Sequence, residues 1–169
     1  MVIEASHLLQ SSVVDATGTK HGAVDTCVYI GDEARLYGLQ LAKAGVITRF
    51  RGVRFADVLS VNQHAIIIDS PAVIEKDLKD FDAVAKATGP VVGVTAKTES
   101  GKKLGKISDV LLDADTGFIV RFYLRNLLSE RIIPRQFLVS ITPREVVFKD
   151  VVDTPLFTQV ATAEAAPVV

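Results

Sequence analysis

One short motif contains residue types that could perform catalysis. Asp115, Thr116 and Gly117 follow the apolar pair Leu111-Leu112, and aspartic proteases place Asp-Thr-Gly after an apolar strand so that two aspartates share a proton. The first half of the chain has no Asp-Thr-Gly at the corresponding position, so only a homodimer would supply the second aspartate. A hairpin turn explains the same residues more simply, because Asp and Gly are typical turn residues. A homodimeric aspartic protease that uses Asp115 is therefore a remote alternative.

Two groups of side chains could suggest a metal site. Asp109, Asp113 and Asp115 lie within a few residues of one another, but a calcium loop also needs a glycine near its middle and a bidentate acid about a dozen positions along. A solvated turn is therefore favoured over a calcium site. The three histidines and the single cysteine show no zinc-ligand spacing, neither Cys-x-x-Cys nor His-x-x-x-His; they are His7, His21, His64 and Cys27. We predict no metal, no cofactor and no catalytic set.

Composition indicates a folded protein without a strong electrostatic preference. The chain has 169 residues, of which 49% are hydrophobic and 23% charged, and its net charge is −1. That charge gives no global attraction to nucleic acid or to anionic membranes. The segment 1–10 lacks a basic region and a long apolar core, and no apolar run is long enough for a membrane-spanning helix. With a single cysteine that cannot form an internal disulfide, we expect a cytoplasmic protein without a membrane span.

A repeated pattern divides the chain into two similar parts. The stretch from Gly18 to Gly22 recurs in altered form from Gly101 to Gly105, an offset of 83 residues (101 − 18). Near the end of each part a serine precedes apolar strand residues, Ser60 and Ser140, with an offset of 80 (140 − 60). Such self-similarity predicts one structural module used twice. Each module is small, so we expect it to pack against its twin or another chain.

Most of the expected elements are short strands. In residues 118–125, Phe118, Val120, Phe122 and Leu124 share one face while Arg121, Tyr123 and Arg125 share the other, which predicts a strand with one buried face. Residues 113–117 predict the hairpin loop that precedes it. Leu78, Phe81 and Ala85 have helical spacing, so a short helix is expected over 75–86, ended by Gly89-Pro90. Further strands are predicted at 6–14, 24–30, 36–41, 46–53, 58–61, 65–68, 91–98, 104–112, 131–133, 138–142 and 145–148.

The order of residues in the second part resembles the PRC-barrel domain. The residues that carry this resemblance are Gly101, Gly105, Ile107, Asp109, Val110, Leu112, Asp113, Thr116, Gly117 and Ile119, followed by Ile132-Ile133-Pro134, residues 137–141 and Val146-Val147. The match covers about residues 91–150. The first part, about residues 5–70, keeps Gly18, Gly22, Val24, Asp25 and the ending over 53–68.

The resemblance implies an all-β protein with two small PRC-type barrels in tandem, joined by a linker with a short helix. We expect a first PRC-barrel-like domain at 1–72, the linker at 73–90, a second PRC-barrel domain at 91–152 and a C-terminal tail at 153–169, whose last ten or so residues are frayed.

Members of the family include the cytoplasmic part of the photosynthetic reaction-centre H subunit, the C-terminal domain of a ribosome maturation factor and small stand-alone proteins. The barrel serves there as a binding or assembly module without chemistry of its own, although a fold does not fix a function. We therefore expect a non-enzymatic module that docks a protein partner. An RNA- or ribosome-associated factor is the alternative, and self-association through unpaired strand edges stays open.

The candidate binding surface is a basic and aromatic face of the second part. Its predicted residues are Arg121, Tyr123, Arg125 and Arg135, with Arg131 and Arg144 nearby, and the first part has a comparable cluster of Arg49, Phe50, Arg51 and Arg54. Arg and Tyr are enriched in interface hot spots. The same residues would also suit RNA, with arginines on phosphates and Tyr123 stacked on a base. A charged face that only keeps a strand soluble explains the pattern equally well.

Overall fold

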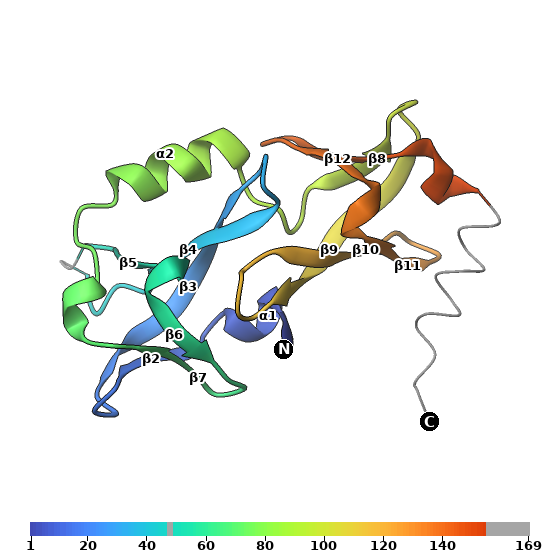
Figure 1. Ribbon diagram of the computed structural model, residues 1–169. Coiled ribbons are helices and arrows are strands. Elements are labelled where there is room, and N and C mark those ends of the chain that lie inside the picture. The colour runs from blue at the N-terminus through green and yellow to red at the C-terminus, as the bar shows by residue number, and fades with distance from the viewer. Residues whose placement is uncertain (47–48, 155–169) are drawn as a thin grey trace, which may run out of the picture.

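The computed structural model describes residues 1–46 and 49–154, which fold into two β-sheets side by side (Figure 1). One sheet has six strands and the other has seven, so the protein is predominantly β, as predicted. Within the described residues, no helix is long and apolar enough to cross a membrane.

The first sheet is built from residues 12–68 in the order β5-β4-β3-β2-β7-β6. Its strands are β2 (Ser12–Asp15), β3 (Lys20–Ile30), β4 (Arg35–Leu41), β5 (Arg51–Arg54), β6 (Val58–Val61) and β7 (Ala65–Ile68). Neighbouring strands are antiparallel except β2 and β7, which are parallel. A 3₁₀ turn, η1 (Phe55–Asp57), connects β5 to β6. We call this part the first half.

The second sheet repeats this arrangement in residues 95–148, with the order β11-β10-β9-β8-β13-β12. Its strands are β8 (Thr95–Thr98), β9 (Lys103–Asp113), β10 (Ile119–Arg125), β11 (Glu130–Pro134), β12 (Leu138–Ile141) and β13 (Glu145–Phe148). Here β8 and β13 are the parallel pair, and the 3₁₀ turn η3 (Arg135–Phe137) connects β11 to β12. This part is the second half; a further 3₁₀ turn, η4 (Asp150–Asp153), follows it.

The two sheets also have their β-bulges in matching places. Each sheet has four shifts in strand register, and every shift leaves one extra residue on one strand. A bulge is a specific local feature, because it turns the following side chains to the other face. The extra residues are His21, Asp25, Tyr37 and Leu59 in the first half and Leu104, Ser108, Val120 and Val139 in the second half. The first three pairs are 83 residues apart and the last pair is 80 apart, the offsets of the sequence repeat.

One of these bulges corrects the predicted alternation along β10. Phe122 and Leu124 are buried as predicted, but Phe118 and Val120 are only half-buried and Ile119 is buried in their place. The register steps from Ile119 opposite Leu112 to Arg121 opposite Leu111, so Val120 is the extra residue. Strict period-two counting therefore fails at the bulge and holds beyond it.

The N-terminal segment differs from the expected strand over 6–14. Residues 5–8 form a one-turn helix, α1 (Ala5–Leu8), and β2 begins only at Ser12. A short strand that was not predicted, β1 (Val2–Glu4), pairs with β9 of the second sheet. The sequence predicted residues 1–72 as one module, whereas these first residues extend the other half. Pairing between distant segments leaves no local signal in so short a stretch.

Two other predicted strands are shorter than expected. The strand expected over 46–53 begins at Arg51, with 47–48 outside the described residues, and the one expected over 91–98 begins at Thr95. The frayed end predicted for the C-terminal tail also lies outside the described residues.

The helix predicted over 75–86 is confirmed as α2 (Lys79–Thr88), preceded by the 3₁₀ turn η2 (Pro71–Val73). Gly89 ends α2 with φ +69°, a backbone conformation that glycine adopts readily. The helix lies along the first half (Figure 1). Its Phe81, 1% exposed, packs over Gly38 of β4 and Gly52 of β5, where a Cβ atom would come within 2.8 Å of the ring.

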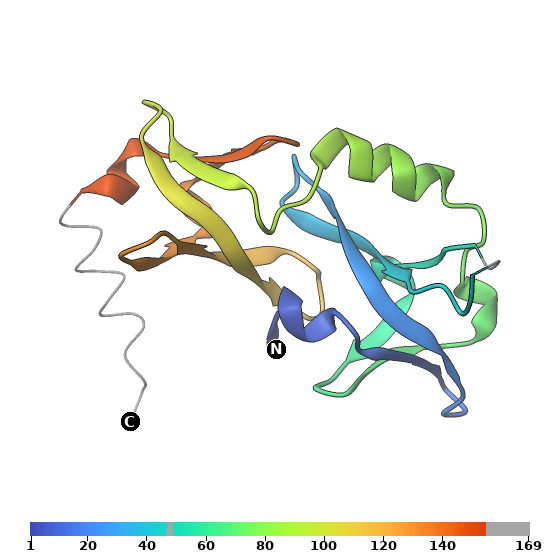
Figure 2. The same cartoon turned by 180° about the vertical axis from the view of Figure 1, so that it is seen from behind.

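The two halves are tightly joined. Their buried side chains form one continuous hydrophobic cluster. Backbone hydrogen bonds also cross the junction, because the Leu36 N–H donates to the Gly117 carbonyl (2.8 Å) and the Ile119 N–H donates to the Ala34 carbonyl (2.8 Å). Helix α1 lies at this boundary next to the long strands β3 and β9 (Figure 2). Small modules that share one core gain stability that neither would have alone.

Candidate docking surface

Three of the four predicted site residues lie together on the outer face of β10. Arg121, Tyr123 and Arg125 alternate with Phe122 and Leu124, which point into the core. The cross-strand neighbours of Arg121 and Tyr123 are half-buried apolar or acidic residues, Leu111 and Asp109 on β9 and Pro134 and Ile132 on β11. Arg125 lies between the exposed Lys106 and Glu130. The structure therefore surrounds the tyrosine with apolar contact area and two arginines.

The tip of the β10–β11 hairpin adds an apolar element that sequence reasoning missed. Leu127 and Leu128 are fully exposed, at 102% and 96%. The Asn126 side-chain oxygen accepts hydrogen bonds from the Leu128 N–H (2.9 Å) and the Ser129 N–H (2.8 Å), which fixes the turn below them. A leucine pair between turn-forming Asn126 and Ser129 was the available signal. We call Arg121, Tyr123, Arg125, Leu127, Leu128 and Ile132 the hairpin surface.

The arginines of the hairpin surface differ in how they are paired. Arg125 forms an ion pair with Glu130 (2.6 Å) across the base of the hairpin, and both side chains are largely exposed. Such a surface pair contributes little to stability, about 0–1 kcal/mol, so Arg125 can exchange Glu130 for another carboxylate at small cost. Arg121 makes no ion pair within the part of the chain that the structure describes. The guanidinium groups of Arg121 and Arg125 are therefore available to bind carboxylates of another molecule.

Tyr123 is held in its neutral, hydrogen-bonding form. Burial raises the pKa of its hydroxyl, and the Glu4 carboxylate adds to the shift. The side chain is half-buried between neighbouring strands. A neutral tyrosine combines the apolar contact area of its ring with a hydroxyl that forms a directional hydrogen bond.

Arg135, the fourth predicted residue, lies elsewhere. Its guanidinium sits over the Phe118 ring (4.5 Å to the centroid) and donates a hydrogen bond to the Glu33 carbonyl of the first half (2.7 Å). Arg35 approaches the same ring at 5.5 Å. The structure thus places Arg135 in the junction between the halves, where its contacts are internal.

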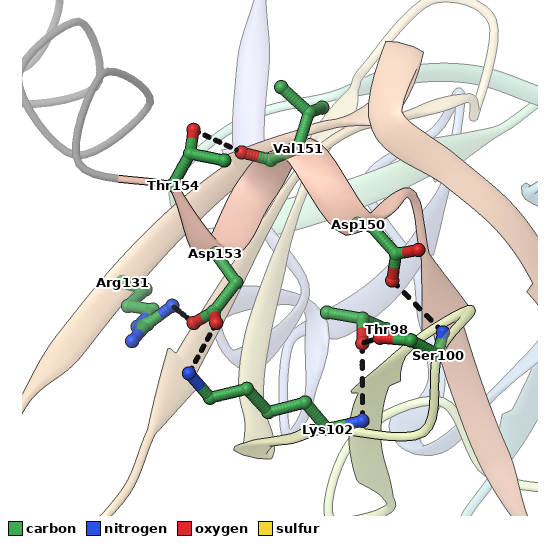
Figure 3. Close-up of polar contacts among 8 residues, drawn as sticks. All are labelled: Thr98, Ser100, Lys102, Arg131, Asp150, Val151, Asp153 and Thr154. Atoms are coloured by element: carbon green, nitrogen blue, oxygen red, sulfur yellow. Dashed lines mark hydrogen bonds and ion pairs between the residues drawn. The ribbon is translucent and has the colours of Figure 1, made fainter.

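Arg131 is also occupied by a contact inside the molecule. Asp153 of η4 accepts hydrogen bonds from Lys102 and from Arg131 (3.3 Å for the latter), as Figure 3 shows. The Lys102 ammonium, followed by Arg131, holds the pKa of Asp153 below its ordinary value. Nearby, Asp150 accepts the Ser100 N–H (2.9 Å). These contacts fasten η4 to the β8–β9 turn and to β11.

The comparable cluster of the first half does not form one surface. Arg54 pairs with Glu75 and Asp80 of the linker and helix α2, and Arg51 donates to the His21 carbonyl (2.8 Å). Phe50 lies under the Lys43 ammonium at 4.4 Å. Arg51 and Arg54 therefore hold the molecule's own segments, whereas Arg49 is exposed.

The same face is covered in one half and open in the other. Two cross-strand pairs occupy matching positions in the two sheets. In the second half they are Arg121 with Pro134 and Tyr123 with Ile132. In the first half they are Gly38 with Arg54 and Gln40 with Gly52. In the first half Phe81 covers the two glycines, and Gly52 exchanges two backbone hydrogen bonds with Glu75 (3.0 and 2.8 Å). Among the described residues, no helix covers the hairpin surface and no strand pairs with the outer edge of β11.

The side chains considered for catalysis have turn or surface roles. Asp113 accepts the Thr116 N–H (2.8 Å) and hydroxyl (2.8 Å), which lower its pKa, whereas the Asp115 side chain is 81% exposed. His21 contacts the Asp15 carboxylate (2.7 Å). His7 and His64 line an open groove of about 630 Å³ beside β1. No group of three or more metal-ligating side chains is found among residues 1–46 and 49–154.

Comparison with known proteins adds no family assignment. The chain matches no model of a protein family and no curated protein. The PRC-barrel resemblance therefore stays a prediction from its motif residues.

Proposed function

We propose that this protein is a non-enzymatic tandem module of the PRC-barrel type that docks a protein partner through its hairpin surface. Support for the tandem comes from the shared strand order and the four matching bulges. Unrelated sheets of this size would not place bulges at the same offsets as the sequence repeat. The two halves on this proposal descend from one small barrel-type module that was duplicated.

The glycines of the motif support the assignment to the PRC-barrel type. Gly101, Gly105 and Gly117 all have positive φ, at +90°, +130° and +75°, where residues with side chains are disfavoured. The positions that define the resemblance therefore have backbone geometry that explains their residue type. Asp113 and Thr116 close the turn between β9 and β10.

The observation that carries the docking proposal is the pair of fully exposed leucines beside Arg121, Tyr123 and Arg125. Exposed apolar residues that cluster with Tyr and Arg are typical of protein interfaces, where water is excluded around a few anchors. A strand that only needed solubility would not end in two solvated leucines.

The first half indicates what kind of partner segment fits. There, an extended residue pairs with the β5 edge and the following helix covers the face through Phe81. We infer that a partner supplies the same arrangement to β11 and β10: an extended residue followed by an amphipathic helix. The second half has Arg121 at the position that matches Gly38 of the first half. The partner helix should therefore carry carboxylates on the side that docks.

The test is a capture experiment followed by titration of the purified partner. The proposal expects Arg121→Glu/Arg125→Glu and Leu127→Ser/Leu128→Ser each to lose a partner that wild type binds. Arg144→Glu, a charge change outside the hairpin surface, is the matched control and should retain it. If both hairpin variants keep the partners of wild type, the hairpin surface has no docking role.

The alternative, an RNA or ribosome contact, draws on Arg121 and on Tyr123 as a stacking platform. Three carboxylates, Glu130, Asp109 and Glu4, border the same surface and would repel phosphates, against one added cation, Lys106 opposite Arg125. RNA binding would weaken steeply with salt because phosphate contacts release counterions. Binding that loses less than about tenfold between 50 and 200 mM salt would exclude RNA in favour of the protein partner.

A further inference from the structure

The contacts between the two halves follow a two-fold pattern. Arg35 lies opposite Phe118 in an isolated antiparallel bridge, and these two residues hold equivalent positions of the repeat, 83 residues apart (118 − 35). The two backbone hydrogen bonds that cross the junction, both 2.8 Å long, flank this bridge and change places when the halves are exchanged. A contact in which both partners offer the same position defines an isologous, two-fold interface.

Backbone conformation extends this equivalence beyond the sequence motif. Within the described residues, every residue with positive φ except Gly89 has a counterpart with positive φ 83 residues away. The pairs are Gln10 and Gly93, Gly18 and Gly101, Gly22 and Gly105, and Ala34 and Gly117. Gln10 and Gly93 also donate their N–H groups to the equivalent carbonyls of Val24 and Ile107 (2.8 and 2.7 Å). The chain therefore enters both sheets in the same way.

The segment that precedes each sheet crosses to the other half. We call residues 1–11 the first arm and residues 84–94 the second arm. The first arm pairs with β9 of the second half through β1, and the second arm packs against β3 of the first half through the end of α2 (Figure 2). Gly31 and Ala114, equivalent positions (114 − 31 = 83), each donate their N–H to the arm that comes from the other half (2.9 and 2.8 Å). The exchange of arms is therefore reciprocal.

Side chains on the two-fold axis favour pairing between unlike halves. The guanidinium groups of Arg35 and Arg135 lie near the Phe118 ring, 5.5 and 4.5 Å from its centroid. A cation beside an aromatic ring is attracted to it. A pair of two first halves would instead place Arg35 against a second Arg35, and this repulsion disfavours the like pair.

Packing beside the axis gives the same preference. Phe55 of the first half lies against Gly117, where a Cβ atom would come within 2.7 Å of the Phe55 ring. The first half has Ala34 at the position that matches Gly117 (117 − 34 = 83). In a pair of two first halves, Phe55 would therefore meet a methyl group in the space that its ring needs.

We propose that the junction face of each half is a pairing surface whose partner is another module of the same type. This chain is then a two-fold dimer of modules fused into one polypeptide, and its arms are the counterparts of arms exchanged between subunits. A second copy of the chain offers the same face. The proposal rests on the duplication proposed above and is independent of the hairpin surface, so docking at that surface can fail without it.

The first experiment asks whether halves of different chains pair. Two full-length variants, both with Cys27→Ser, carry one new cysteine each, Arg35→Cys or Phe118→Cys. Opposite residues in such a bridge have Cα atoms about 4.5 Å apart, which a disulfide can span. The variants are refolded together from urea at about 1 mM, near the effective concentration of linked halves, and oxidised. The proposal expects mixed disulfide dimers more than about fivefold above the dimers from either variant alone.

Two controls on the same background decide the result. Arg35→Cys/Phe118→Cys in one chain should form an internal disulfide in dilute solution, which shows that the variants fold and that the two positions face each other. Arg35→Cys mixed with Glu99→Cys, an exposed position in the β8–β9 turn, gives the level of random oxidation. Mixed dimers no more abundant than that level, or the absence of the internal disulfide, overturn the proposal.

A charge test isolates the side chains on the axis. Phe118→Arg adds a third guanidinium group there and should lower the urea midpoint of the full chain. The loss should shrink as salt rises from about 50 to 500 mM, because salt screens like charges. Adding Arg35→Phe should recover most of the loss, and Phe118→Leu, which adds no charge, should depend little on salt. Losses that simply add in Arg35→Phe/Phe118→Arg would contradict the proposed preference for unlike halves.

Discussion

The two halves share a scaffold and differ in what covers it. Strand order and bulge positions agree, yet helix α2 and Glu75 close one face of the first half, whereas the equivalent face of the second half is open. The residues beneath follow this difference, with Gly38 and Gly52 under Phe81 but Arg121 and Ile132 at the matching positions. The same sheet thus serves as an internal contact in one half and as a surface in the other.

The β2–β3 turn and the matching β8–β9 turn also keep a shared backbone arrangement with different side chains. In the β2–β3 turn, the Asp15 carboxylate accepts the Thr17 and Thr19 N–H groups (2.9 and 3.0 Å). In the β8–β9 turn, the Thr98 hydroxyl takes that place and accepts the Lys102 N–H (3.1 Å). The turn keeps its geometry while its acceptor changes from a titratable group to a neutral one.

Removing Phe81 tests the closed face and should have the largest effect. Phe81→Ala leaves a cavity over Gly38 and Gly52 and should lower the free energy of unfolding by about 3–5 kcal/mol, measured by urea denaturation. Phe50→Ala, a change of the same size at a more exposed ring, is the control. A loss below about 1 kcal/mol for Phe81→Ala would mean that α2 does not cover this face.

Adding a methyl group beneath α2 should have the next largest effect. A Cβ at position 38 would lie 2.6 Å from the Phe81 ring and 2.8 Å from the Val53 carbonyl oxygen. Gly38→Ala should therefore cost about 1–3 kcal/mol in urea denaturation. Arg121→Ala, at the matching position of the second half, should change the free energy of unfolding by no more than about 0.5 kcal/mol. Equal losses for the two variants would contradict the difference between the closed and the open face.

The two turns should respond differently to pH, with a smaller effect. The Thr17 hydroxyl, followed by His21, holds the pKa of Asp15 well below its ordinary value. Asp15 therefore stabilises the fold above its unfolded pKa of about 3.9, and that stabilisation is lost as pH falls toward the folded pKa. Asp15→Asn should reduce stability at pH 7 more than at pH 3. The effect of Thr98→Val should differ less between the two pH values, because the Thr98 hydroxyl is only the weakest of the groups that lower the pKa of Asp150. A pH-independent effect of Asp15→Asn would contradict this.

The smallest effect on stability is expected at the open face. Leu127→Ser/Leu128→Ser changes side chains that are already solvated, so the free energy of unfolding should move by no more than about 0.5 kcal/mol. Partner binding should nevertheless be lost. A large destabilisation would show that the leucines pack within this chain and are not a docking element.

Local patterns predicted the parts of the fold that depend on local forces. Alternation in β10 beyond Val120 and helical spacing in 75–86 were sufficient for a strand and for α2. The outer positions of Arg121, Tyr123 and Arg125 followed from that alternation. The PRC-barrel resemblance and the docking role remain predictions.

Long-range contacts account for what the sequence did not reveal. Strand β1 pairs with β9 more than a hundred residues away, and Arg135 is drawn to Phe118 and Glu33 across the junction. The exposure of Leu127 and Leu128 depends on which segments pack nearby. Hydrophobic periodicity does not show which apolar side chains are left uncovered by other segments.

Hydrogen–deuterium exchange of the free and partner-bound protein tests the central claim most directly. In the free protein the Gly52 amide, bonded to Glu75, should exchange slowly, and the Ile132 amide at the same register position should exchange quickly. Partner binding should protect residues 121–134 and leave β5 and α2 unchanged. Equal protection of both edges in the free protein, or partner protection confined to the first half, would contradict the account.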